Sequence, residues 1–319
     1  MLLTDYLRTE PDAAWSLALQ CGVTHGTIRL PDDPDYDFTD LSALKAIVER
    51  FKSHGITPVV LEPLPNQLHD HIKTGDALRD ESIDKFIKLM SNLREVGIHT
   101  VCFNFMAHYG WTRTDTTLPE RGGATVTGFS LEKFAPDEFT LDRETLWQNY
   151  EYFIKAVIPY AERYDIRLAL HPDDPPLERL GNVARIFTNL DAIKRGISTV
   201  SSPNLGVTFW QACYNLMGER LEEAISEIEE KIFFVHFRNV RGIKTNFSET
   251  FHDNGDIDMA STMKLYVENG IDVPIRVDHV PTLAGEESGV AGYDTLGRLF
   301  AIGYLKGILD GLNAARNIC

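Results

Sequence analysis

Eight short apolar runs, separated by amphipathic segments, constrain the fold of this chain more than any other feature. The runs lie at Leu2–Tyr6, His25–Leu30, Thr57–Glu62, Thr100–Phe105, Arg167–His171, Leu205–Trp210, Ile232–Phe237 and Pro274–His279. Several are apolar almost throughout, as in HTVCFNF and KIFFVHF, which is typical of strands buried on both faces of a parallel sheet. Helices are predicted near 12–20, 41–53, 81–95, 142–164, 182–194, 219–229, 258–269 and 295–313. This alternation predicts an α/β fold of the closed (β/α)8 type, the TIM barrel, rather than an open sheet.

The length of the chain agrees with one such barrel. It has 319 residues, a size that α/β barrels commonly reach as a single domain. There is no low-complexity tract, no linker rich in serine or glycine, and no internal repeat that we can detect. We therefore expect a single TIM-barrel domain over residues 1–319.

Charge and composition exclude several classes of partner. A formal net charge of -16 argues against binding nucleic acid through its phosphates. No stretch approaches the 18 or so apolar residues of a membrane span, and the N-terminus lacks the pattern of a signal peptide. The four cysteines, Cys21, Cys102, Cys213 and Cys319, have no paired spacing, which favours a reduced, cytoplasmic setting.

One connection is much longer than the others. Roughly 35 residues with little regular pattern separate the strand ending at Phe105 from the helix beginning near Asp142. Loops of this length in compact domains are usually functional, and this one follows the carboxyl end of a strand, where barrel active sites are built. We interpret it as a lid over the substrate; a surface excursion is the alternative.

Polar residues at the ends of three late strands carry the strongest functional signal. His171 closes the strand in LALHPDDPP, His236 lies within the apolar strand FFVHF, and Asp278 follows the strand in PIRVDHV. Two imidazoles and a carboxylate on neighbouring strands suit ions such as Mn, Fe, Zn or Mg. A hydrogen-bonded core histidine is the simpler interpretation for either histidine alone, but the set of three favours metal ligation.

Other polar residues follow the same logic with less force. Asn104, Arg113, Asp115 and Arg238 lie at or just after strand ends, and we take them as candidate substrate-binding residues. The two arginines suit a two-point clamp on a substrate carboxylate. Internal ion pairs with the barrel's own acids are the alternative, and the sequence does not choose between the two.

Five motifs in order resemble the mannonate dehydratase family of the xylose isomerase-like barrels. They are VCFNFMAHYGWTRTD, LALHPDDPP, SSPNLGVTF, VHFRNVRG with FSETFHDNGDIDM, and RVDHV with AGYDTLGRLFAIGYLKGI, and together they span nearly the whole chain. The resemblance implies a sugar-acid dehydratase that converts D-mannonate to 2-keto-3-deoxy-D-gluconate and water. It also implies a divalent metal, with Mn²⁺ favoured over Fe²⁺, Zn²⁺ or Mg²⁺.

The same resemblance implies roles for individual residues. His171, His236 and Asp278 match the family's metal ligands. His279 and Tyr293 match the histidine and tyrosine that the family uses for proton transfer as catalytic residues.

One of the family's metal ligands is not matched in this chain. The family's metal-binding cysteine falls where this chain has Trp210, whose indole offers only a hydrogen-bond donor. Either Cys213, three residues on, becomes the fourth metal ligand through a bulge at the strand end, or three protein ligands suffice. The RTD element of the long loop matches Arg113 and Asp115.

Two other functions stay open from the sequence. A sugar isomerase or epimerase on the same barrel would use a metal and a proton-shuttling histidine for related enediolate chemistry. A catalytically silent paralogue that only binds a sugar acid is the third hypothesis, motivated by Trp210. Barrel enzymes of this kind often form homo-oligomers, and the run GRLFAIGYLKGIL suits both core packing and an interface.

Overall fold

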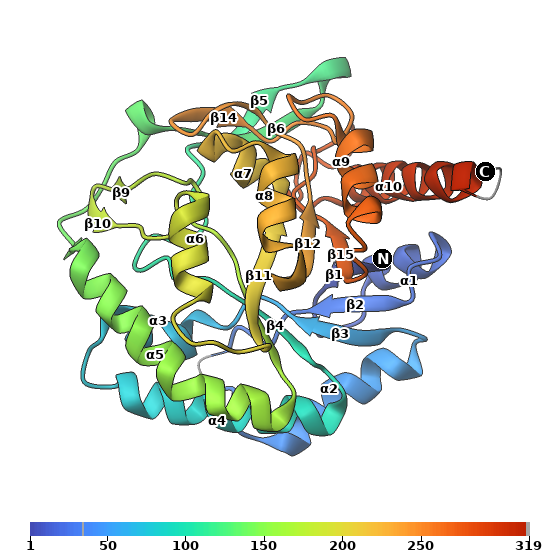
Figure 1. The fold of residues 1–319 in the computed structure, drawn as a ribbon. Coiled ribbons are helices and arrows are strands. Elements are labelled where there is room, and N and C mark those ends of the chain that lie inside the picture. The colour runs from blue at the N-terminus through green and yellow to red at the C-terminus, as the bar shows by residue number, and fades with distance from the viewer. Residues whose placement is uncertain (34, 317–319) are drawn as a thin grey trace.

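The structure, a computed structural model, describes residues 1–33 and 35–316, so that Cys319 lies outside the described residues. Eight parallel strands close into a barrel in the order β1-β15-β12-β11-β8-β4-β3-β2 (Figure 1). They are β1 (Leu2–Leu7), β2 (His25–Ile28), β3 (Thr57–Leu61), β4 (Thr100–Phe103), β8 (Arg167–Leu170), β11 (Leu205–Trp210), β12 (Ile232–Phe237) and β15 (Pro274–Val277). The predicted TIM barrel is confirmed, and each apolar run supplies one barrel strand.

Helices surround the barrel. They are α1 (Ala13–Gln20), α2 (Leu41–Ser53), α3 (Asn66–Thr74), α4 (Arg79–Val96), α5 (Arg143–Tyr164), α6 (Leu190–Ile197), α7 (Gln211–Met217), α8 (Leu221–Ile228), α9 (Met259–Glu268) and α10 (Thr295–Arg316). Several begin at an acidic or amide side chain, as where Asp142 accepts a hydrogen bond from the backbone N–H of Thr145. Among the described residues, no helix combines the length and apolar character that crossing a membrane requires.

The helix predicted near 182–194 is wrong in its first half. Asn182–Ala184 form the short strand β10, which pairs with β7 (Thr140–Leu141) and β9 (Arg179–Leu180), and α6 begins only at Leu190. The buried carboxylate of Asp173 accepts hydrogen bonds from the backbone N–H groups of Ile186 and Phe187. Because these two N–H groups bond to Asp173, they are not available for helical hydrogen bonds, although the apolar spacing of the segment suits a helix.

The long connection after β4 contains more regular structure than its sequence predicts. It forms β5 (Asp115–Pro119) and β6 (Thr125–Ser130), which join β14 (Asn246–Ser248) and β13 (Arg241–Ile243) in a four-stranded antiparallel sheet. We call this the accessory sheet; Figure 1 places it at one end of the barrel. Both contributing connections leave carboxyl ends of barrel strands, so the accessory sheet lies on the side where barrel active sites are built.

The barrel interior is packed with side chains. A small cluster of Val60, Cys102, Ala169, Phe233 and Phe234 joins four barrel strands. A much larger apolar cluster fills the space between the strands and the surrounding helices. Apolar side chains therefore fill the barrel interior, and the polar residues lie beyond them at the carboxyl ends of the strands.

Candidate active site

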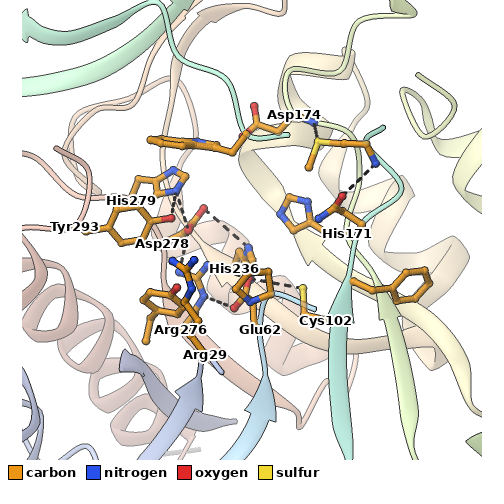
Figure 2. A pocket seen from close by; sticks show the side chains of 16 residues that line it. Arg29, Glu62, Cys102, His171, Asp174, His236, Arg276, Asp278, His279 and Tyr293 are labelled. Atoms are coloured by element: carbon orange, nitrogen blue, oxygen red, sulfur yellow. Dashed lines mark hydrogen bonds and ion pairs between the residues drawn. The ribbon is translucent and has the colours of Figure 1, made fainter. Parts of the chain in front are cut away.

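A cavity of about 200 Å³ lies at the carboxyl ends of the barrel strands. Figure 2 shows the side chains that line it. They are Tyr6, Arg29, Glu62, Pro63, Cys102, Phe103, Asn104, Met106, Trp111, His171, Asp174, His236, Arg276, Asp278, His279 and Tyr293. The barrel therefore brings residues from across the sequence to one small polar site.

His171, directly after β8, has one ring nitrogen available to a ligand. Its Nδ1 lies 2.7 Å from the carbonyl oxygen of Pro172, so Nδ1 carries the proton and Nε2 keeps a lone pair. Burial, followed by the nearby His236, lowers the pKa of His171 to about 4. The ring is therefore neutral at pH 7, which is the form that binds metal ions.

His236 and Asp278 line the same cavity as His171. The rings of His171 and His236 lie 5.0 Å apart between centroids, and Nδ1 of His236 lies 4.0 Å from Oδ2 of Asp278. Two ligands that each lie about 2.0–2.2 Å from one cation are separated by no more than about 4 Å. Within the described part of the chain, the buried Nδ1 of His236 makes no hydrogen bond, which is rare for a buried polar atom. Two imidazoles and a carboxylate at one cavity are donor types that suit a divalent metal ion. In the described residues, however, these three side chains do not bring one ligand atom each within 4.8 Å of one another.

Glu62 orients His236 from behind. Its Oε1 lies 2.8 Å from Nε2 of His236, and its two oxygens accept hydrogen bonds from Arg276 at 2.8 and 3.1 Å. Burial alone would raise the pKa of Glu62, but Arg276 and His236 outweigh it and hold the pKa well below its usual range. A charged carboxylate behind a metal-binding histidine is the usual arrangement that fixes the ring and its tautomer.

A second set of donor atoms lies beside the first. One ligand atom from each of Glu62, Cys102 and His236 lies within 4.8 Å of the other two. Burial and the neighbouring Glu62 raise the pKa of the Cys102 thiol well above its ordinary value, and that thiol points its proton at Glu62 across 3.6 Å. Glu62, Cys102 and His236 therefore offer a second donor set for a divalent ion, and a metal bound there would take Cys102 as the thiolate.

The structure does not bring Cys213 to the cavity wall. Cys213 lies buried on α7, and its thiol donates a hydrogen bond to the carbonyl oxygen of Asp173 across 3.3 Å. Trp210, at the end of β11, is also fully buried and lies behind His171, with the two rings stacked at 5.4 Å. The guanidinium of Arg238 sits 4.1 Å from the centre of the indole. The indole thus packs against the site without entering the cavity.

His279 and Tyr293 meet inside the cavity. Nε2 of His279 lies 2.8 Å from the hydroxyl of Tyr293, and the ring of Trp111 covers His279 at 4.6 Å. Burial raises the pKa of Tyr293 above its ordinary value, so the phenol keeps its proton at neutral pH. The pair brings a hydrogen-bond donor and acceptor together in the cavity that His171, His236 and Asp278 also line.

Of the four candidate substrate-binding residues, the structure places Asn104 in the cavity wall. Arg113 instead forms a two-point ion pair with Asp174 at 2.9 and 2.7 Å. Arg238 pairs with Glu249, and Asp115 lies on β5 with Lys133 2.8 Å away. Both arginines are thus in internal ion pairs, the alternative that the sequence left open.

Two cavity arginines had no predicted role. Arg276 lies on β15 and precedes Asp278, directly after that strand, by two residues, and alternation along an extended chain puts such residues on the same face. That spacing was a usable signal. Arg29 directly follows β2 and lies near the end of the predicted run His25–Leu30, so its place at a strand end was a usable signal as well.

The fold is that of a TIM barrel, and it is similar to the fold of xylose isomerase-like proteins. The chain superposes on the crystal structure of a xylose isomerase domain protein from Planctomyces limnophilus with a TM-score of 0.63, covering 100% of this chain and 99% of that one. At 12% sequence identity, this likeness concerns the fold alone.

Closer matches identify the family within that class. A family model described as D-mannonate dehydratase (UxuA) matches residues 15–140 and 131–318. The mannonate dehydratase of Oceanobacillus iheyensis is 34% identical over 303 residues, which cover 85% of each chain. The crystal structure of mannonate dehydratase from Streptococcus suis serotype 2 matches with a TM-score of 0.88 and 28% identity, covering 99% of this chain and 95% of that one. This chain belongs to the D-mannonate dehydratase family, and the resemblance drawn from its sequence is confirmed.

Proposed function

We propose that this protein is a metal-dependent hydro-lyase that dehydrates D-mannonate to 2-keto-3-deoxy-D-gluconate. The observation that carries the proposal is the His279–Tyr293 pair, 2.8 Å apart, in the same cavity as His171, His236 and Asp278. Membership of the D-mannonate dehydratase family supports the same reaction. The small cavity suits one sugar acid.

The proposed metal ligands are His171, His236 and Asp278, with Mn²⁺ as the favoured ion. When bound there, a divalent cation supplies Lewis-acid stabilisation for negative charge that develops on the substrate's carboxylate and 2-hydroxyl oxygens. His171 offers Nε2 and His236 offers Nδ1, because their other nitrogens face Pro172 and Glu62. The proposed ligand set contains three protein groups and leaves out Cys213.

Proton transfer falls to His279 and Tyr293. One of them removes the proton from C2 of the substrate, and the other protonates the 3-hydroxyl as its C–O bond breaks. The products are water and an enol, which takes a proton at C3 to become the 2-keto-3-deoxy acid. Trp111, carried by the long connection, covers His279 and helps to exclude bulk water from this step. This role is the basis for regarding the connection as a lid.

The decisive experiment is an assay of purified protein with manganese and D-mannonate. We expect a keto-deoxy product whose mass is lower by one water, about 18 Da. A product of unchanged mass would indicate isomerisation or epimerisation instead. No turnover, together with less than about a tenth of an equivalent of metal after reconstitution, would favour a silent sugar-acid-binding paralogue.

We further propose a cytoplasmic location. The three cysteines of the described residues, Cys21, Cys102 and Cys213, are free thiols. Free thiols are the norm in the reducing cytosol.

A further inference from the structure

Glu249 is a fully buried acid that neither the sequence nor the family resemblance singled out. It follows β14 in the accessory sheet, and its side chain is 1% exposed. Its Oε1 accepts hydrogen bonds from Arg113 and Arg238 and lies 3.0 Å from Nδ1 of His279. Its Oε2 accepts a hydrogen bond from the hydroxyl of Thr127. In the described structure, the hydrogen bonds and ion pairs of this carboxylate are thus with hydrogen-bond donors or with a histidine ring.

Two cations keep this buried acid ionised. Burial would raise the pKa of Glu249, but Arg113 and Arg238, followed by His279, outweigh it and hold the pKa well below its usual range. If Glu249 contacted only the two arginines, the ion-pair cluster would have a structural role alone. It extends instead to His279, whose other nitrogen contacts Tyr293.

The two groups that meet Nδ1 of His279 make opposite demands on it. Glu249 can only accept a hydrogen bond, so it favours a proton on Nδ1. Arg238, whose Nη1 lies 2.5 Å from the same nitrogen, can only donate, so it favours a bare Nδ1. In a neutral imidazole the state of one nitrogen determines the state of the other. The competition therefore decides whether Nε2 presents a lone pair or a proton to Tyr293.

We propose that Glu249 is a positioning residue for the dehydration. It accepts the Nδ1–H of His279, draws the positive charge of Arg238 onto its own carboxylate, and leaves the lone pair of Nε2 facing the hydroxyl of Tyr293. Without the carboxylate, Arg238 donates to Nδ1 and the ring takes the opposite tautomer. The proposed effect of Glu249 on the reaction rests on the proposed function. Its proposed effect on the tautomer of His279 does not.

The same carboxylate joins the lid to the catalytic pair. Arg113 and Thr127 both belong to the long connection between β4 and α5, and Arg113 also grips Asp174 beside His171. Glu249 itself comes from the connection after β12. One carboxylate therefore contacts both connections and His279, so the position of the accessory sheet and the orientation of His279 depend on the same group.

The test compares Glu249→Gln and Glu249→Asp with a matched control, Glu120→Gln. Glu120 also links the two connections, through Asn254 and Arg241, but the described structure gives it no contact with His279. In the manganese-loaded enzyme, we expect Glu249→Gln to lower kcat for D-mannonate by about 100-fold or more, with KM and metal content changed by less than about threefold. Glu249→Asp should recover part of kcat, and Glu120→Gln should leave it unchanged.

The tautomer is measured directly by NMR on protein labelled with ¹⁵N-histidine, with the His279 signals assigned by their loss in His279→Gln. We expect the proton on Nδ1 in the wild-type chain and on Nε2 in Glu249→Gln. A wild-type ring protonated on Nε2, an unchanged tautomer in Glu249→Gln, or an unchanged kcat would overturn the proposal. If the wild-type protein does not turn over D-mannonate, the proposed reaction fails, while the tautomer measurement still decides the role of Glu249.

Discussion

Nε2 of His279 lies 2.8 Å from the hydroxyl of Tyr293, although the two residues leave the backbone 14 positions apart. His279 follows the last barrel strand, and Tyr293 comes just before α10. Both residues line the cavity, and the ring of Trp111 packs against the ring of Tyr293. It places a proton donor and a proton acceptor at one point of the cavity wall, and the proposed chemistry depends on it.

Removal of the Tyr293 hydroxyl tests that contact. Tyr293→Phe keeps the ring and should lower kcat for D-mannonate by about 10²–10⁴-fold, the usual contribution of general acid–base catalysis, with little change in KM. Formation of the 2-keto-3-deoxy acid is the measurement. Tyr160→Phe, on an exposed part of α5, is the control. Activity near the wild-type level in Tyr293→Phe would remove this residue from the mechanism.

Metal content tests the proposed ligands. Asp278→Asn removes the anionic ligand, and we expect bound manganese to fall below about a tenth of an equivalent after chelation and reconstitution. Asp115→Asn makes the same chemical change on the accessory sheet and should retain the wild-type content. Metal analysis of both proteins decides the matter, and equal occupancy in the two would contradict the assignment of Asp278.

Trp210 makes a structural prediction. Because its side chain is fully buried against His171 and Arg238, Trp210→Cys should leave a cavity and lower the free energy of unfolding by about 3–5 kcal/mol. Urea unfolding of the metal-free protein measures this loss. The matched change Trp111→Cys, at a residue 40% exposed, should cost clearly less. Losses of equal size would show that Trp210 does not pack as the structure has it.

His252 should make the fold sensitive to mild acid. Burial lowers its pKa to about 4, and its Nε2 lies 2.7 Å from the carbonyl oxygen of Phe237. A histidine in the unfolded chain has a pKa near 6.5. Below that pH the unfolded chain binds a proton at His252, whereas the folded chain binds it only near pH 4. The contribution of His252 to the free energy of unfolding should therefore fall by up to about 3 kcal/mol as the pH drops from about 6.5 to about 4.

Urea unfolding at pH 7 and pH 5 measures this effect. His252→Gln should be less stable than the wild-type chain at pH 7 but should lose less stability on acidification. His99→Gln, at an exposed histidine, should follow the wild-type slope. A wild-type slope in His252→Gln would mean that other groups carry the acid sensitivity.

The patterns that predicted the barrel strands can be recognised from each strand's own residues. A strand buried on both faces must be apolar throughout, so runs such as HTVCFNF and KIFFVHF mark barrel strands without knowledge of their neighbours. The accessory sheet gave no such signal, because β6 pairs with β14 from a connection more than a hundred residues away. The strand β10 was missed for a similar reason: the hydrogen bonds that Asp173 accepts from the backbone N–H groups of Ile186 and Phe187 override a spacing that suits a helix.

The same division runs through the site. His171, His236 and Asp278 could be recognised as site candidates from local sequence, since polar residues interrupt apolar strands only where something compensates their burial. The ion pairs of Arg113 and Arg238, the packing of Trp210 behind His171 and the contact of Glu249 with His279 follow from the folded structure alone. Those contacts depend on the direction of side chains between segments distant in sequence, which no local periodicity records.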